Sequence, residues 1–446
     1  MPNRGEPLDR PTMPVRGASF AETALFTASL GSMQGGRLLY AFALASKLNP
    51  AEFTAWSLVM ASLAYLPLLT LGLINGLGRS LPYLAGAGDS EEERTSVGTS
   101  WFVVLGLAAI GLVVAVWVAL ALGTYKPVLI LAVLATWAVF QLQQVILRSY
   151  LKFIAASYQQ LTIGFLSIAA AVVVFLGPLQ GFEQAVLAYA LAVVGAIVVG
   201  TAAHSPVFAL PSARVFVRLV AVGWPIAAAG VLFGVLISAD RWIATALIGA
   251  RGAAPYVLAA TLASGLMLLP NAISQQTYPR MARIYGATKD FHEVLRLAKS
   301  QNRVAGLGTF LLVVPASILA SAAILVLPSE YREGIPVLIV LSASLVCLAQ
   351  STGYGNALNT LGRQWVYLSA QAGALFAGVS AMAILGTLLG VSGVALGVAV
   401  GYAAFALFVR LPFRRMAGHP RVEPDSAPPQ PKESGVCEAA DVVRPQ

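Results

Sequence analysis

The sequence predicts an all-α integral membrane protein of about twelve transmembrane helices, arranged as two parallel-repeat lobes of six helices each. Three observations predict this fold. Of the 446 residues, 58% are hydrophobic and 11% are charged, whereas an ordinary soluble protein carries roughly 25% charged residues. Apolar stretches of about 20 residues, enough to cross a hydrocarbon core of about 30 Å, recur from end to end with short breaks. Similar segments also recur in the same order in the two halves.

The elements follow one another with little chain between them. Residues 1–19 are polar and rich in Pro and Gly, and residues 414–446 have too few apolar side chains to offset the entropy of ordering. We therefore expect a cytoplasmic segment at 1–19, an N-lobe at 20–203, a C-lobe at 204–413 and a disordered cytoplasmic tail at 414–446. The expected spans are 20–46, 54–83, 97–122, 127–150, 158–179, 184–203, 216–239 with an extension to 249 left open, 253–277, 303–327, 334–360, 365–387 and 390–412.

Topology explains the formal net charge of +9. With the N-terminus inside, 22 Lys and Arg residues fall on one side of the membrane and four on the other, which is a strong positive-inside pattern. An even number of spans places both termini in the cytoplasm. Arginine outnumbers lysine 22 to six, as is typical of GC-rich bacterial genomes. We expect a multi-pass protein of the bacterial inner membrane, and no nucleic-acid partner is needed.

Motifs for catalysis and for nucleotide binding are missing. His204, His292 and His419 are isolated, and the two cysteines, Cys347 and Cys437, differ in depth. No HExxH, CxxC or GxxxxGK[ST] pattern occurs. The sequence thus disfavours ATP-driven transport and predicts no metal, no cofactor and no enzyme.

Two charged connections between spans are expected on the cytoplasmic side, one acidic and one basic. The acidic cluster DSEEER (89–94) is interpreted as a solvated loop between spans 2 and 3. The basic connection 278–302 has Phe291, Val294, Leu295 and Ala298 at helical spacing. That spacing predicts a helix lying on the inner leaflet, with an ordinary solvated connector as the alternative.

An internal repeat relates the two halves of the chain. Three pairs of segments fall in the same order: LNPAEFTAWSLVMA (48–61) with GARGAAPYVLAATL (249–262), GRSLPYLAG (78–86) with QQTYPRMARIYG (275–286), and LQQVILRSYLKF (142–153) with LAQSTGYGNALNTLGR (348–363). Because six spans return the chain to its starting side, the halves must be parallel repeats. Transporters with such repeats bind their substrate between the lobes.

The same segments resemble a known family. LNPAEFTAWSLV, LGLINGLGRSLPYLAG, DRWIATALIGA with the following YVLAATL, and LPNAISQQTYPRMARIYG are similar to the polysaccharide-biosynthesis branch of the multidrug/oligosaccharidyl-lipid/polysaccharide exporter superfamily, the Wzx-type flippases. The resemblance covers about residues 20–415. It implies a V-shaped, MATE-like pair of six-helix bundles. It also implies movement of an undecaprenyl-diphosphate-linked oligosaccharide from the inner to the outer leaflet by alternating access.

A carrier of such a substrate needs a polar and preferably cationic path. Span 1 places Gly31, Gln34 and Gly35 on one face, which Arg37 borders. Counting about 1.5 Å per residue from Glu22 puts Arg37 about 22 Å into the membrane. Guanidinium binds phosphate oxygens bidentately, so Arg37 and Gln34 are candidate substrate ligands. The alternatives for Arg37 are an acidic partner in the other lobe and a side chain that snorkels outward.

Three further spans carry candidate substrate ligands. Span 4 has Gln141, Gln144, Arg148 and Lys152 on one helical face. That face suits a cavity wall, and equally suits cytoplasmic anchors with glutamines that bond between helices. Spans 8 and 10 contribute amides that serve either substrate binding or helix packing: Asn271 and Gln275, and Gln350, Asn356 and Asn359.

Asp240 and Arg241 interrupt the apolar stretch ISADRWIATALIGARG (237–252). They lie either at the outer end of span 7 or, if that helix extends farther, inside its outer third. Neighbouring helical residues point about 100° apart and neutralise each other poorly. We expect Asp240 to pair with Arg37 across the lobes when the outer side is closed, and Arg241 to pack or bind within its own lobe. Asp240 is also the carboxylate placed to couple transport to an ion gradient.

The sequence favours a flippase for a polyprenyl-diphosphate-linked oligosaccharide of O-antigen, capsule or exopolysaccharide. A cation-coupled small-molecule exporter of the same superfamily is the first alternative, and the lack of acids inside spans 1–6 disfavours it. A membrane glycan polymerase or glycosyltransferase, which would need an acidic pair, is the second. Expected partners are the lipid-linked substrate, membrane lipids and pathway polymerases and glycosyltransferases, with the chain itself a monomer.

Overall fold

The computed structural model describes residues 20–48, 66–177, 181–204, 209–326 and 329–416, together with residues 52, 56, 59, 60, 62 and 63. These residues are helical almost throughout, and no strand occurs among them. The expectations for residues 1–19, for the turn after span 1 and for the tail beyond 416 lie outside the described residues.

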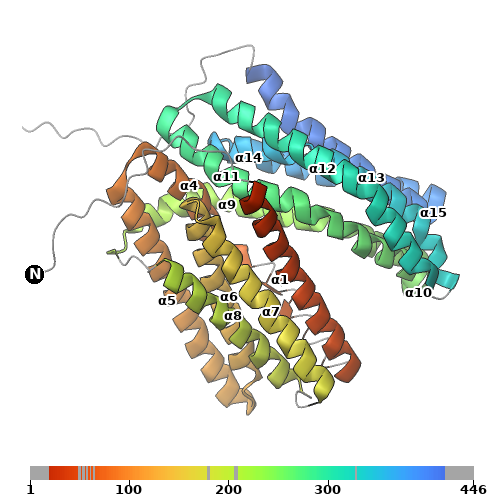
Figure 1. Cartoon of the computed structure of the whole chain (residues 1–446), viewed down its shortest axis with the longest axis horizontal. Helices are drawn as coiled ribbons and strands as arrows, with labels where there is room; N and C mark the ends of the chain where they lie inside the picture. The colour runs from red at the N-terminus through yellow and green to blue at the C-terminus, as the bar shows by residue number, and fades with distance from the viewer. Residues whose placement is uncertain are drawn as a thin grey trace, which may run out of the picture.

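The helices form two bundles that diverge in a V (Figure 1). One hydrophobic core runs from Phe26 to Leu219 and includes Ala272, and a second runs from Leu236 to Phe413. We refer to the bundles around them as the N-lobe and the C-lobe. The N-lobe helices are α1 (Phe20–Lys47), α3 (Leu66–Leu69), α4 (Leu73–Ala87), α5 (Ser90–Leu122), α6 (Lys126–Ser149), α7 (Phe153–Leu176) and α8 (Phe182–Ala203). The C-lobe helices are α9 (Ala213–Leu236), α10 (Ala239–Ser264), η2 (Gly265–Met267), α11 (Leu268–Thr288), α12 (Phe291–Val326), η3 (Ser329–Glu333), α13 (Gly334–Ala349), α14 (Thr352–Thr360) and α15 (Gln364–Met416).

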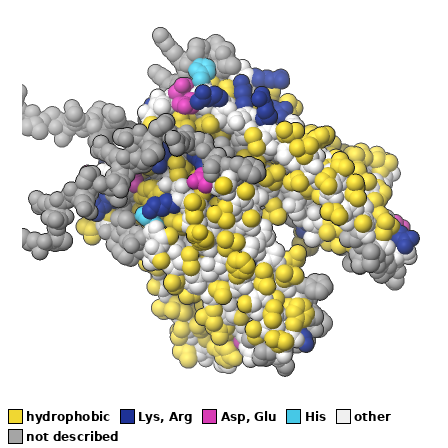
Figure 2. Space-filling model, viewed as in Figure 1, with side chains coloured by type: hydrophobic (Ala, Val, Ile, Leu, Met, Phe, Trp, Pro, Cys, Tyr) yellow, Lys and Arg dark blue, Asp and Glu magenta, His cyan; other side chains and the backbone are white. Residues whose placement is uncertain are grey.

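The predicted fold class is confirmed. Nine helical stretches within the described residues are long and apolar enough to cross a membrane. Large apolar side chains cover the outer faces of both lobes (Figure 2), as on α5, where Trp117 is 72% and Leu120 79% exposed. Such surfaces are stable in lipid and would aggregate in water. The chain is therefore built to have hydrocarbon around it.

Two glycines at positive φ turn the chain back inside long helical stretches. Gly249 (φ 74°) separates two antiparallel arms of α10, and Gly390 (φ 62°) does the same in α15. Only glycine adopts such backbone without strain. The first turn settles the extent of span 7, because residues 213–249 form one apolar stretch with the extension to 249. Asp240 therefore lies nine residues, about 14 Å of helix, before the turn.

Two cytoplasmic predictions are wrong. DSEEER is no solvated loop: Asp89 accepts a hydrogen bond from the Glu92 amide and caps α5, whose first turn contains the glutamates. The interfacial helix expected within 278–302 is absent, since α11 ends at Thr288 and α12 begins at Phe291. Val294 and Ala298 are fully buried in the C-lobe core, so the apolar spacing served packing and not membrane contact.

Glycines let the two lobes cross closely at one end. A Cβ on Gly86 of α4 would lie 1.9 Å from the Arg283 carbonyl oxygen of α11, and a Cβ on Gly286 would lie 2.0 Å from the Tyr83 carbonyl oxygen. Gly223 of α9 meets α4 in the same way. The Gly86 and Gly286 contacts are reciprocal, as expected where two repeats related by a two-fold axis meet.

The crossing lies at the basic end of the molecule. Most Lys and Arg side chains on the face shown in Figure 2 gather toward the end where α4 and α11 meet. By the positive-inside rule we expect this end to be the cytoplasmic one. The lobes thus touch at the basic end and diverge toward the opposite end, and we refer to these ends by the expected orientation.

Candidate functional site

Three adjoining chambers lie between the lobes. The upper one has a volume of about 910 Å³ and is lined by α1 of the N-lobe and by α9, α10, α11, α13 and α15 of the C-lobe. A middle chamber of about 510 Å³ shares Gln34 and Arg37 with it. A lower chamber of about 380 Å³ shares Gln141, Arg148 and Gln275 with the middle one. Together they lead from the outer side to the crossing of α4 and α11.

The predicted face of span 1 lines the upper chamber. Gly31, Gln34, Gly35 and Arg37 all border it. The neighbouring Gly36 points the other way, since a Cβ there would lie 2.4 Å from the Gly164 oxygen of α7. This contact fixes the rotation of α1 on α7 and turns the polar face toward the cavity.

Arg37 rests on two aromatic rings of its own lobe. Its Cζ lies 5.3 Å from the centroid of Trp137 and 5.8 Å from that of Tyr189. None of the four ion pairs between described residues includes it. The rings attract the cation without neutralising it, so its charge stays available to the chamber. The sequence alone does not single out Trp137, because its partner Arg37 comes from another helix.

Arg148 lies at the junction of the middle and lower chambers. Its Nε donates to the Gln144 carbonyl oxygen at 3.0 Å, and its Nη1 donates across the lobes to Gln275 Oε1 at 2.5 Å. It too takes part in no ion pair between described residues. The structure thus brings Gln141, Arg148 and Gln275 together from α6 and α11.

Gln144 borders the middle chamber, but its amide is fully engaged. Its Nε2 donates to the Ala156 carbonyl oxygen and to Gln159 Oε1, and its Oε1 accepts from Gln160. Gln143 and Ser29 extend these bonds into a chain across the N-lobe. Gln144 therefore ties helices together in this conformation.

Lys152 departs from the predicted stripe. Helix α6 ends at Ser149, and Leu151 adopts a positive φ of 59°. Lys152 consequently leaves the face shared by Gln141 and Arg148 and contacts His204 Nδ1 at 3.2 Å.

The lower chamber holds polar groups that the sequence only partly revealed. Asn356 Nδ2 donates to Ser274 Oγ at 2.8 Å and to Gln301 Oε1 at 3.1 Å. Tyr278 lines the chamber, and its buried hydroxyl has no hydrogen-bond partner among the described residues. Tyr278 follows Ser274 by four residues on α11, and this helical spacing is the feature of the sequence that places both on one face.

Asp240 is held within the C-lobe wall of the upper chamber. It is 3% exposed; its Oδ2 accepts from the Tyr256 hydroxyl at 2.9 Å and its Oδ1 from the Arg241 amide at 2.8 Å. Tyr256 reaches it because the turn at Gly249 folds the second arm of α10 back. Arg37 borders the same chamber from the other lobe. Pairing of the two, expected for a closed outer side, stays a prediction.

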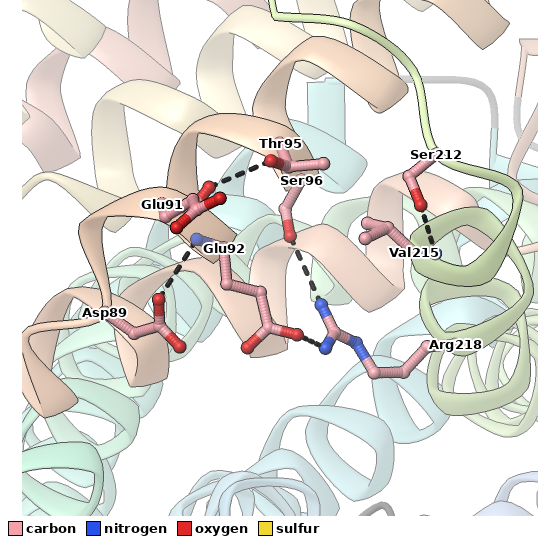
Figure 3. A network of polar contacts seen from close by, with 8 residues as sticks. All are labelled: Asp89, Glu91, Glu92, Thr95, Ser96, Ser212, Val215 and Arg218. Carbon is pink, nitrogen blue, oxygen red and sulfur yellow. Dashed lines mark hydrogen bonds and ion pairs between the residues drawn. The ribbon is translucent and has the colours of Figure 1, made fainter. Parts of the chain in front are cut away.

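Contacts between the lobes close the basic end, which we expect to be cytoplasmic. Glu92 of α5 forms an ion pair with Arg218 of α9, and Arg218 also donates to Ser96 (Figure 3). Nearer the cavity, Glu22 of α1 lies 3.7 Å from Arg280 of α11. Thr23 donates to Gln276, and Arg79 to the Asn359 and Thr360 carbonyl oxygens. These contacts cover the lower chamber from below.

The three chambers have an unbalanced charge. Arg37, Arg148 and Arg241 line them, and Asp240 is the only acidic residue among the described residues that do so. Two arginines therefore face the cavity without an acidic partner. Arginines so placed can hold phosphate oxygens through charge-assisted hydrogen bonds.

No protein-family model matches the chain, and no curated protein matches it. Solved structures do. An outward-facing multidrug resistance MATE family transporter of the MOP superfamily is 17% identical, with a TM-score of 0.78 over 90% of this chain and 97% of that one. A crystal structure of a mutant MATE is 17% identical, with a TM-score of 0.76 over the same shares of both chains.

A third similar structure is a MOP superfamily transporter from Pyrococcus furiosus, for which a binding pocket of reverse polarity suggests a different function. It is 15% identical, with a TM-score of 0.74 over 90% of this chain and 95% of that one. The chain therefore has the fold of the MATE transporters of the MOP superfamily.

Proposed function

We propose that this protein is a flippase that moves a polyprenyl-diphosphate-linked oligosaccharide from the inner to the outer leaflet of a bacterial plasma membrane by alternating access. The observation that carries the proposal is the pair Arg37 and Arg148 in one continuous cavity, neither paired with an acid among the described residues. A half-buried cation without a counter-ion favours an anionic ligand. A diphosphate is such a ligand.

The upper chamber adds an apolar surface that suits a lipid-linked substrate. Leu38, Phe233 and Met267 line it beside the Gln34 and Arg37 face. A head group with both charge and hydroxyls needs arginine and amide contacts, while a polyprenyl chain needs hydrocarbon. One cavity offers both kinds of surface.

Complementation tests the proposal directly. In a strain that lacks its own flippase, the gene is expected to restore surface polysaccharide. Arg148→Gln should lower the export rate at least about tenfold, because a hydrogen bond to a charged group contributes about 1.5–3 kcal/mol. Arg148→Lys keeps the charge and loses the bidentate geometry, so its export rate should lie between those of wild type and Arg148→Gln.

The matched control is Arg296→Gln. Arg296 is exposed on α12 and pairs with Glu293, so the substitution removes the same charge away from the cavity. Equal expression of the three variants, measured in membranes, separates transport from folding. Full export by Arg148→Gln at normal levels contradicts an anion site at Arg148.

A cation-coupled exporter is the second candidate, and Asp240 favours it. Its carboxylate is buried beside the Tyr256 hydroxyl in the wall of the upper chamber. In proteoliposomes, an imposed proton or sodium gradient would then drive uptake by wild type and fail to drive Asp240→Asn. Flipping at the same rate with and without either gradient would leave Asp240 a structural or gating role.

A glycan polymerase fits the cavity less well. Such an enzyme needs an acidic pair, and the described chamber walls hold the single carboxylate of Asp240. The proposed partners are the lipid-linked substrate, membrane lipids and the polymerase and glycosyltransferases of the same pathway. The chain is proposed to act as a monomer.

A further inference from the structure

A second group of cations lies below the cavity, where the lobes touch. We call Arg79, Tyr83, Tyr285, Lys289 and Arg363 the mouth cluster. The Tyr83 ring lies between two cations, with Arg79 Cζ at 5.0 Å and Lys289 Nζ at 3.8 Å from its centroid. Lys289 also donates to the Tyr83 hydroxyl, and the Tyr285 ring lies 6.1 Å from the Tyr83 ring. Arg79 and Tyr83 belong to the N-lobe, and the other three residues belong to the C-lobe.

Neutral acceptors hold Arg79 in this closed arrangement. Its Nε donates to the Asn359 carbonyl oxygen at 3.4 Å and its Nη2 to the Thr360 carbonyl oxygen at 3.3 Å, both at the end of α14. The C-terminal end of a helix carries a partial negative charge. These bonds are long, however, and bonds to a phosphate would be shorter and about twice as strong.

The mouth cluster has no direct acidic partner within the described part of the chain. None of the ion pairs between described residues includes Arg79, Lys289 or Arg363. Arg79 Nη2 would lie 3.6 Å from a Cβ placed on Gly362, the neighbour of Arg363, so like charges from the two lobes lie close together. In this arrangement the cations come together, and the partners of Arg79 and Lys289 among the described residues are rings, a hydroxyl and carbonyl groups.

We propose that the mouth cluster is a phosphate-binding site that opens the cytoplasmic side. A phosphate-bearing head group binds Lys289 and Arg363 of the C-lobe, and so releases Tyr83 and Arg79 of the N-lobe. The donors are occupied when the lobes touch and free when they part, so the anion binds the open state better and shifts the population toward it. This role rests on the proposed function, because it assigns the first contact of the same substrate.

The head group of the substrate and the head group of an inner-leaflet lipid share this chemistry. Spin labels at Glu91→Cys on α5 and His292→Cys on α12, both exposed, report the distance between the lobes on the cytoplasmic side. One arm adds inorganic pyrophosphate to the protein in phosphatidylcholine nanodiscs, against sulfate at matched ionic strength. The other arm replaces half of the lipid by phosphatidylglycerol. The two native cysteines are replaced by serine throughout.

Pyrophosphate, phosphatidylglycerol or both should raise the ratio of long to short distances at least about fivefold, the low end of usual ligand coupling. The arm that responds identifies the source of the phosphate. Arg79→Gln with Lys289→Gln should abolish the response. Lys152→Gln with Arg296→Gln removes the same charge from the cytoplasmic side outside the mouth cluster. This double variant should open as much as wild type does.

An unchanged distance in both arms overturns the proposal, as does an equal response in the Arg79→Gln, Lys289→Gln variant. Unfolding midpoints of the two double variants show whether either is misfolded. The readout needs no transport. If the protein fails complementation and still opens with pyrophosphate, the mouth cluster is supported and the proposed function is contradicted. If it restores surface polysaccharide and does not open with either phosphate source, only the mouth-cluster proposal is contradicted.

Discussion

At the scale of single residues, the cavity is notable for what its arginines contact. Arg37 lies against rings and Arg148 against amide and carbonyl oxygens, so no acid among the described residues pairs with either cation. An acid in either place would hold the guanidinium in a permanent pair. Aromatic and amide partners instead orient the cation while an anion can still displace them.

Sequence periodicity predicted these arginines but few of their partners. Gln34, Arg37, Gln141 and Arg148 stand out because polar residues are rare in apolar spans. Tyr278 does not, since its exposure to the cavity depends on how α11 is rotated against α4. Helix rotation is set by close contacts between distant segments, which one sequence does not show.

His204 gives the protein a pH-dependent stability. Burial and the neighbouring Lys152, in that order, lower the pKa of His204 below its ordinary value. The folded state therefore binds this proton less readily than the unfolded state. The stability contributed by neutral His204 is complete above about pH 6.5, the unfolded value, and is lost as the pH falls through the folded value.

Thermal unfolding in detergent between pH 7.5 and pH 5, values chosen on either side of the about 6.5 expected for free histidine, tests this assignment. The unfolding midpoint of wild type should fall on acidification, and His204→Asn should flatten the fall. His292→Asn, which changes an exposed histidine on α12, should retain the wild-type slope. A His204→Asn profile parallel to that of wild type would refute the assignment.

At the scale of elements, the sequence predicted which segments are helical, but it did not predict where the helices begin and end. Apolar length fixed the spans, because hydrocarbon thickness sets a minimum. The first turns of α5 and α12 were missed because they are charged. Asp89 caps one, and Val294 and Ala298 bury the apolar side of the other, so both helices continue beyond the membrane.

The glycine crossing of α4 and α11 should control closure of the cytoplasmic side. Gly286→Ala places a Cβ 2.0 Å from the Tyr83 carbonyl oxygen, so the helices must separate. Overpacking of this kind costs about 1–3 kcal/mol, which should shift the distance between labels at Glu91 and His292 toward the open state. Gly106→Ala is the control, since nothing lies within 4 Å of a Cβ there. Equal distances in both variants would show that the crossing does not limit closure.

The pair of Glu92 and Arg218 joins α5 to α9 on the same side (Figure 3). Both side chains are about one-third exposed or less, so the coupling should be modest, about 0.5–1 kcal/mol. A double-mutant cycle with Glu92→Gln and Arg218→Gln, followed by denaturant unfolding, measures it. Strict additivity of the two substitutions would mean that the ion pair itself does not help to hold α9 against α5.

At the scale of the whole molecule, two lobes that meet at one end need a second meeting place at the other. The proposed alternating access would require the outer side to close when the cytoplasmic side opens. The reciprocal contacts of Gly86 and Gly286 define the meeting place seen in this structure. Arg37 and Asp240, on opposite walls of the upper chamber, are placed to define the other.

Closure would exchange partners at both residues. Arg37 would leave Trp137 and Tyr189, and Asp240 would leave the Tyr256 hydroxyl, to form one ion pair between the lobes. Asp240→Arg should then abolish export, because two cations would face each other as the outer side closes. Arg37→Asp combined with Asp240→Arg should restore part of the export, since it recreates the pair with reversed charges and keeps one cation in the chamber. A harmless Asp240→Arg substitution, with no rescue in the double variant, would show that the outer side closes through other residues.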